Sequence, residues 1–144
     1  MEVAMRTDVT LREEYVLKLW DTYINENLVQ STPCKAAIYD ACSLRLIIAS
    51  DGFYLLNNEI HNISEGMRYP EEAYRNGIDI QSRHYDDRLA DGRNGIYARD
   101  KSDGCTVCKT STLLIVGVSD NKVKSEESNE QIMKLGDYFR KIGL

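Results

Sequence analysis

The sequence predicts a single α+β domain, in which helices pack against the faces of an antiparallel sheet. Two amphipathic segments near the ends of the chain have the periodicity of helices, and most segments between them have the length and composition of short strands. No internal repeat and no linker divides the 144 residues. A chain of this length has room for one modest hydrophobic core.

The first amphipathic segment predicts a helix that begins near Thr10. Thr10 and Glu13 form a capping-box pattern, in which each side chain satisfies a backbone N–H group of the first turn. Pro33 marks where the helix has ended, because proline cannot continue the hydrogen-bonded ladder. The apolar residues recur at spacings of three and four and form one broad face: Leu11, Tyr15, Val16, Leu19, Trp20, Tyr23, Ile24 and Leu28.

The middle of the chain predicts short strands separated by turns. Residues 36–39 and 44–49 are expected to form a hairpin about a turn at 40–43. Further apolar runs are bounded by Asn-Gly, Asp-Gly and Ser-Asp pairs, which are typical of turns. These runs predict four more strands: 77–81, 95–99, 105–109 and 112–118.

Two short helical segments and one charged segment complete the middle region. Helical spacing of three apolar residues predicts a helix over 55–67. Pro70 suits a first helical position and predicts a helical turn at 71–75. The segment 82–94 is too charged for the core, so we expect an extended loop or a projecting hairpin there.

A final helix is expected over residues 128–142. Ser128 and Gln131 form a second capping box at its start. Acidic residues gather at its beginning and basic residues toward its end, as the helix dipole favours: Glu126, Glu127, Glu130, Lys134, Arg140 and Lys141. One face is apolar: Ile132, Leu135, Tyr138, Phe139 and Ile142.

Composition and charge exclude several classes of protein. Hydrophobic residues make up 42% and charged residues 28%, which is typical of a globular domain and not of a disordered chain. The 18 basic and 23 acidic residues give a net charge of −5, which disfavours nucleic acid as a partner, because phosphate contacts need clustered Lys and Arg. The apolar runs are too short to span a membrane, and the N-terminus lacks the pattern of an export signal. We therefore expect a cytoplasmic protein whose four cysteines are reduced thiols.

Enzyme chemistry finds little support in the sequence. His61 and His84 lack the context of a catalytic base, and no glycine-rich phosphate-binding loop is present. Cys105 and Cys108 have metal-ligand spacing, but structural zinc needs four ligands, and residues three apart in a strand point to opposite faces. The adjacent acidic pairs Glu71-Glu72 and Asp86-Asp87 are typical of a solvated surface. We expect a protein without catalytic residues, bound metal or cofactor.

Trp20 and Tyr23 lie three residues apart and therefore on one helix face. Two interpretations stay open. Both side chains pack in the core, or they form an aromatic ledge on which a proline-rich segment docks in the polyproline conformation. Tyr138 would complete the ledge if the two terminal helices lie side by side.

Three segments of the chain together resemble a known family. The helix from Trp20 to Leu28 is similar to the opening helix of profilins, and residues 35–39 are similar to their first strand. The end of the chain resembles profilins most specifically, in Thr106-Val-Cys-Lys109-Thr, Leu113-Leu-Ile-Val-Gly-Val-Ser-Asp120, Asn129, Lys134-Leu-Gly-Asp-Tyr-Phe139 and Gly143-Leu144. The resemblance covers about residues 18–144 and is weakest in the middle.

The resemblance implies a central antiparallel sheet with the N- and C-terminal helices on one face and short helices on the other. It also implies a monomer that binds monomeric actin, regulates actin polymerisation in the cytoskeleton and holds proline-rich partners, with phosphoinositides as further ligands. The domain would span residues 17–144, after an N-terminal extension at 1–16. That extension either lengthens the first helix or regulates access to the aromatic groove.

For proline-rich segments the resemblance implies a groove formed by Trp20, Tyr23, Tyr138 and Phe139. Ile47 and Ile48 stand where many profilins carry a second tryptophan. Aliphatic side chains cannot stack on a pyrrolidine ring as an indole does. We therefore expect a groove that is present but weakened.

For actin the resemblance implies four contact residues: Gln81, Arg99, Lys101 and Lys134. Two departures from the family favour an alternative. The segment 82–94 is longer than in plant or animal profilins, and Glu130 stands where some animal profilins carry lysine. The alternative is an adaptor of profilin fold that binds proline-rich or lipid partners without actin.

Overall fold

The computed structural model describes residues 14, 16–20, 34–50, 52–68, 77–90, 95–120 and 122–144. Its architecture is α+β, as the sequence predicts: one antiparallel sheet of six strands, a second of two strands, and helices on both faces. Residues 16–19 are helical. The elements that follow are β1 (Cys34–Asp40), β2 (Leu46–Ala49), α2 (Asn57–Arg68), β3 (Ile78–Ile80), β4 (Arg83–Tyr85), β5 (Asp87–Ala90), β6 (Gly95–Asp100), β7 (Asp103–Lys109), β8 (Leu113–Ser119) and α4 (Lys122–Lys141).

The main sheet has the strand order β2-β1-β8-β7-β6-β5. All of its pairs are antiparallel; Ile38 on β1 lies opposite Ile115 on β8, and Val107 on β7 lies opposite Val116. Successive side chains of a strand point to opposite faces, so a strand covered on both sides needs apolar residues at consecutive positions. This requirement explains the unbroken apolar run that begins β8.

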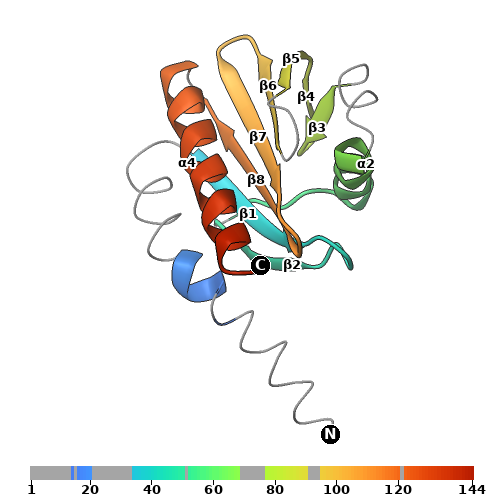
Figure 1. Ribbon diagram of the computed structural model, residues 1–144. Coiled ribbons are helices and arrows are strands. Elements are labelled where there is room, and N and C mark those ends of the chain that lie inside the picture. The colour runs from blue at the N-terminus through green and yellow to red at the C-terminus, as the bar shows by residue number, and fades with distance from the viewer. Residues whose placement is uncertain are drawn as a thin grey trace, which may run out of the picture.

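α4 covers one face of the main sheet and packs on β7 and β8 (Figure 1). Helical residues near the start of the chain join it, so both predicted terminal helices contribute to one core. That core contains Val16, Leu19, Trp20, Ala36, Ile38, Cys108, Leu113, Ile115, Ile132, Leu135 and Phe139. We call it the terminal-helix core.

The opposite face of the sheet is covered by α2 and by the small β3–β4 sheet (Figure 1). This second core contains Ala37, Tyr39, Phe53, Leu55, Ile60, Ile63, Ile78, Ile80, Tyr85, Ile96, Ala98, Cys105, Val107, Leu114 and Val116. Successive side chains of the central strands therefore belong alternately to the two cores.

Two glycines allow α4 to approach the sheet closely. A Cβ atom on Gly117 of β8 would clash with Cδ1 of Ile132, and one on Gly136 of α4 would clash with Sγ of Cys108. Larger residues would push the helix from the sheet, and close packing penalises such overlap.

The charged segment 82–94 differs from its prediction as a loop or one projecting hairpin. It contributes β4, which pairs with β3, and β5, which forms an edge of the main sheet against β6. Tyr85 is buried in the second core, although charged residues surround it in the sequence. Strand pairing and one buried aromatic side chain thus outweigh the local charge.

The start of the last helix also differs from its prediction. α4 begins at Lys122, and Ser128 is a buried residue within the helix. The predicted capping box at Ser128 and Gln131 is therefore wrong, as is the predicted acidic first turn. The basic last turn, Arg140 and Lys141, is confirmed. Within the described residues, none of the helices is both long and apolar enough to cross a bilayer.

The predicted hairpin at 36–49, the helix at 55–67 and the strands at 95–99, 105–109 and 112–118 are confirmed within a few residues. The helical turn at 71–75 and most of the first helix lie outside the described residues.

Candidate binding surfaces

The predicted aromatic groove divides into a buried part and an edge. Trp20 is 5% exposed and Phe139 is 0% exposed, and both belong to the terminal-helix core. Tyr138 is half-buried and packs against the outside of that core, as do Ile47 and Ile48. Tyr23 lies outside the described residues. Of the described aromatic candidates, Tyr138 is thus the one that offers substantial surface to a ligand.

The end of α4 is fixed to the turn between β7 and β8. Gly143 has φ +88°, and the N–H groups of Gly143 and Leu144 donate to the carbonyls of Arg140 and Phe139, which forms a Schellman motif. The Leu144 carbonyl accepts hydrogen bonds from the Thr110 hydroxyl at 2.8 Å and from the Thr112 hydroxyl at 2.7 Å. These bonds hold the last turn of α4, and Tyr138 with it, in a defined position.

Arg99 joins β6 to α4. Its Nε donates to the Tyr97 hydroxyl at 3.0 Å, and its Nη2 lies 3.3 Å from Oε1 of Glu126. The side chain is only 13% exposed. The structure therefore gives this candidate contact residue a partly covered position with an acidic neighbour.

Lys101 and Lys134 are both exposed. Lys101 occupies the turn between β6 and β7 with φ +60°, and Lys134 pairs with Glu130 one helical turn away at 3.1 Å. Residues four apart on a helix share a face, so Glu126, Glu130 and Lys134 form one stripe of α4. Through Glu126 this stripe also reaches Arg99, which brings Arg99 and Lys134 to the same side of the molecule.

Gln81 lies apart from Arg99 and Lys134. It stands in the β3–β4 turn, where its side chain donates to the Gly52 carbonyl at 3.2 Å. This turn is on the face of the sheet that α2 covers, opposite α4. The structure does not bring Gln81 together with Arg99 and Lys134.

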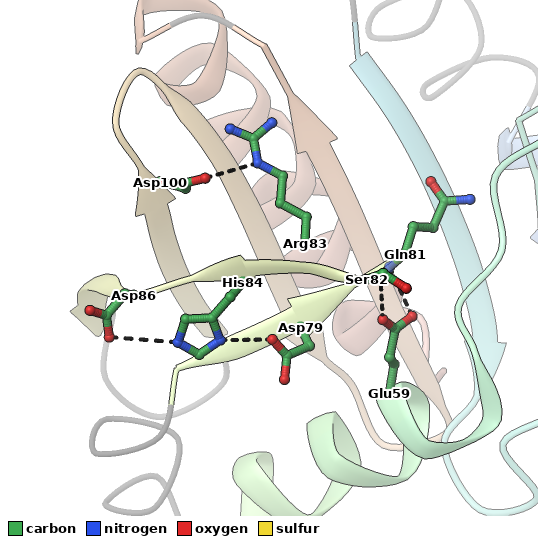
Figure 2. A network of polar contacts seen from close by, with 8 residues as sticks. All are labelled: Glu59, Asp79, Gln81, Ser82, Arg83, His84, Asp86 and Asp100. Atoms are coloured by element: carbon green, nitrogen blue, oxygen red, sulfur yellow. Dashed lines mark hydrogen bonds and ion pairs between the residues drawn. The ribbon is translucent and has the colours of Figure 1, made fainter.

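A buried carboxylate that the sequence reasoning missed holds this turn. Glu59 of α2 is 2% exposed and accepts N–H groups from Gln81 at 2.8 Å, Ser82 at 2.7 Å and Leu56 at 2.9 Å. The bond from Leu56 is half of a capping box, but the cap residue is apolar, so the usual sequence pattern is absent. Figure 2 shows the carboxylate directed at the backbone of the turn.

The same small hairpin carries a further polar network. Arg83 Nε lies 3.0 Å from Oδ2 of Asp100, and Nη1 lies 2.5 Å from Oδ2 of Asp103. At the other end of the hairpin the exposed His84 lies between Asp79, at 2.7 Å, and Asp86, at 3.7 Å (Figure 2). The network links β4 to the turn that carries Lys101.

A sequence model of the family described as Profilin matches residues 18–144. The chain belongs to the profilin family. Profilin-1 of Dictyostelium discoideum is 28% identical to it over 124 residues, which cover 86% of this chain and 98% of that one. Profilin-1A of Acanthamoeba castellanii is 27% identical over 120 residues, which cover 83% and 94%. The resemblance seen in the sequence is thereby confirmed.

Solved profilin structures share the fold. Acanthamoeba castellanii profilin IA superposes with a TM-score of 0.74 at 26% identity and covers 87% of this chain and 99% of its own. Mouse profilin IIa, solved in complex with a double repeat from the FH1 domain of mDia1, superposes with a TM-score of 0.67 at 17% identity. That match covers 87% of this chain and 99% of the mouse chain.

The Cys105 and Cys108 thiols of this profilin point to opposite faces of β7, as the strand period predicts. Cys105 is buried in the second core, and Cys108 is buried in the terminal-helix core. The sheet separates them, so they cannot bind one ion together. Among the described residues, no cluster of three or more His, Cys, Asp or Glu side chains is arranged to hold a metal.

Proposed function

We propose that this profilin binds monomeric actin, regulates its polymerisation and links it to proline-rich partners. The family match over residues 18–144 carries the proposal. The role is one of binding rather than catalysis, in the cytoplasm and in association with the cytoskeleton. Residues 1–16 precede the family match, and we assign them to an N-terminal extension.

The proposed actin surface consists of Arg99, Lys101 and Lys134. Two observations support it: contacts through Glu126 bring Arg99 to the stripe that carries Lys134, and Lys101 follows Arg99 by two residues in an exposed turn. Cations at an interface steer association with an acidic partner and set its specificity. Gln81, on the other face, has at most a peripheral part in this surface.

The proposed site for proline-rich segments lies at Tyr138. Its ring stands at the edge of the terminal-helix core, beside side chains that are themselves buried. The complex of mouse profilin IIa with an FH1 repeat supports a partner of this kind. Ile47 and Ile48 beside the same core supply apolar contact but no aromatic stacking, so we expect weak binding.

Polymerisation of pyrene-labelled actin tests the actin surface. Increasing amounts of the wild-type protein should slow spontaneous assembly, and Lys101→Glu should weaken that effect by about tenfold in concentration. Lys141→Glu is the matched control, because it makes the same charge change at an exposed position in the last turn of α4. Equal loss in both variants would contradict a specific role for the Lys101 turn.

One observation favours the adaptor without actin as a second candidate. Glu126 and Glu130 pair with two of the three proposed cations and reduce their attraction for an acidic partner. For the adaptor, the wild-type protein would leave actin assembly unchanged at tens of micromolar, which corresponds to binding weaker than about 6–7 kcal/mol. It would still bind a proline-rich peptide.

We also propose that phosphoinositides bind this profilin and compete with actin. Lys101 and Lys134 are exposed and suit anionic headgroups as well as an acidic protein surface. Vesicles that contain phosphatidylinositol 4,5-bisphosphate should therefore compete with actin for the wild-type protein. Vesicles of neutral lipid serve as the control.

A further inference from the structure

The turn between β6 and β7 holds its exposed lysine in an unfavourable backbone conformation. Asp100 and Asp103 are opposite one another in the register of β6 and β7, at the two ends of the turn. Lys101 lies between them with φ +60°. Glycine is preferred at this position of a two-residue hairpin turn, because a side chain there costs of order 1 kcal/mol. Neighbouring contacts must therefore stabilise the turn.

Arg83 supplies such contacts from outside the β6–β7 hairpin. Its guanidinium uses two nitrogens for two carboxylates, Nε at 3.0 Å from Asp100 and Nη1 at 2.5 Å from Asp103. These carboxylates stand on either side of the turn, so one side chain joins the end of β6 to the start of β7. The guanidinium also lies 5.4 Å from the centre of the Tyr85 ring, and Tyr85 is a buried residue of the second core.

The strength of this contact follows from charge and partial burial. The three side chains are 39%, 38% and 20% exposed for Arg83, Asp100 and Asp103. Burial by itself lowers the pKa of Arg83, but hydrogen bonds to Asp103 and Asp100 outweigh it and raise that pKa above its ordinary value. A planar guanidinium that binds two acceptors at once is also held more rigidly than an ammonium group.

Arg83 is itself held in place by the buried carboxylate of α2. It is the first residue after the β3–β4 turn, in which Gln81 and Ser82 both have positive φ, +50° and +66°. Glu59 accepts the N–H groups of both turn residues. A continuous set of contacts therefore runs from α2 through the small hairpin to the Lys101 turn, and Figure 2 shows most of it.

We propose that Arg83 is a positioning residue for the actin-facing turn: it fixes the backbone around Lys101 and neutralises the two carboxylates beside it. Without Arg83 the turn would present Asp100 and Asp103 next to a single lysine, a net negative patch toward an acidic partner. The inference rests on the proposed function, because it takes the Lys101 turn as part of the actin surface. It assigns a role to a residue on the face of the sheet opposite α4.

A double-mutant cycle on actin affinity tests the positioning role. Arg83→Met should weaken binding by about tenfold and Arg83→Lys by less, since lysine keeps the charge without the two-point contact. In a Lys101→Ala background, Arg83→Met should have a clearly smaller further effect, because the side chain that it positions is absent and only the loss of charge neutralisation at Asp100 and Asp103 remains. Arg68→Met, which removes an exposed arginine of α2 that pairs with Glu65, is the matched control.

Two further measurements separate positioning from general damage. Binding of a proline-rich peptide should be unchanged in Arg83→Met, since Tyr138 lies on the opposite face of the sheet. Backbone hydrogen exchange should accelerate at residues 101–104 in Arg83→Met and not in Arg68→Met.

The outcomes distinguish the inference from the function on which it rests. A wild-type protein that does not bind actin would overturn the proposed function, and the actin-facing role of the turn with it. Normal wild-type binding with no loss in Arg83→Met would overturn only the positioning role. An equal loss with and without Lys101, or a parallel loss of peptide binding, would overturn it as well.

Discussion

Glu126 on α4 lies 3.3 Å from the guanidinium of Arg99 on β6, so an acidic side chain partly neutralises a cation of the proposed actin surface. Glu126 is itself well exposed, and its stripe of α4 continues to Glu130 and Lys134. The pair thus joins sheet to helix and also lowers the positive potential that an acidic partner would meet. Both effects can be separated by substitution.

Replacing Glu126 with glutamine should strengthen binding to actin. The amide can still accept a hydrogen bond from Arg99, but the negative charge is gone. An exposed ion pair contributes up to about 1 kcal/mol, so we expect an increase in affinity of about two- to fivefold, mainly in the association rate and less at high salt. Stopped-flow association at two ionic strengths measures it, with the adjacent Glu127→Gln as control. An equal gain in the control would show that only net charge matters.

Replacing Tyr138 with alanine should weaken binding to a proline-rich peptide without unfolding the protein. The half-buried ring offers stacking surface at the edge of the terminal-helix core, and its loss should cost about three- to tenfold in affinity. Trp20→Ala is the contrasting variant: Trp20 is buried, so we expect a loss of about 3–5 kcal/mol in the free energy of unfolding. Peptide titration by fluorescence anisotropy, together with chemical denaturation, separates the two effects. Unchanged peptide affinity in Tyr138→Ala would place the groove elsewhere.

Replacing Glu59 with glutamine should destabilise the fold through the β3–β4 turn. The carboxylate accepts three backbone N–H groups, and an amide oxygen with an adjacent NH2 cannot accept them all. We expect a loss of about 1–3 kcal/mol in the free energy of unfolding, measured by denaturation in urea. Glu65→Gln, at an exposed position of the same helix, is the control.

The same cause predicts a rescue. Both turn residues have positive φ, which asparagine and glycine tolerate better than glutamine and serine. Combining Gln81→Asn and Ser82→Gly with Glu59→Gln should therefore recover part of the lost stability. No recovery would mean that the carboxylate stabilises the start of α2 rather than the turn.

Stability should fall at alkaline pH because buried acids, among them Cys105 and Tyr85, ionise in the unfolded chain at lower pH than in the fold. Burial raises the pKa of the Cys105 thiol, although a hydrogen bond from the backbone of Ala98 opposes this shift. Burial is also the main cause that raises the pKa of Tyr85, and the negative charge of a neighbouring Cys105 thiolate is the second cause. An acid whose folded-state pKa is raised stabilises the fold fully below its unfolded-state pKa, here about 8.5 for cysteine and 10 for tyrosine. Above those values the stabilisation is lost as pH rises toward the folded-state pKa, by up to about 1.4 kcal/mol per pH unit for each group.

Urea denaturation between pH 8 and pH 11 measures this decline. Cys105→Ala and Tyr85→Phe should each flatten it, although each variant starts from a lower or altered stability at neutral pH. Cys42→Ala, which removes an exposed thiol, should leave the slope unchanged. An equally steep decline in all variants would assign the alkaline loss to other groups.

The sequence alone determined the elements whose signal is local. Consecutive apolar residues in β8 require a strand covered on both faces, and the two-residue period places Cys105 and Cys108 on opposite sides. The helical spacing of the last segment identified its buried face, including Ile132, Leu135 and Phe139. The family resemblance likewise rested on residues that keep their order and spacing along the chain.

Only the tertiary structure decided the features that depend on distant neighbours. The charged segment 82–94 forms two strands because β3 and β6 provide hydrogen-bonding edges for it, and α4 begins before the capping pattern at Ser128. Charged residues in a sequence window suggest a solvated loop. Arg83, however, pairs with Asp100 and Asp103, which lie 17 and 20 positions further along the chain. Glu59 accepts a hydrogen bond from the Gln81 turn at a comparable separation along the chain, and no sequence pattern in either segment predicts this contact. Local periodicity records which face of an element is apolar, whereas ion pairs, turn strain and the separation of Gln81 from Arg99 arise when the chain closes on itself.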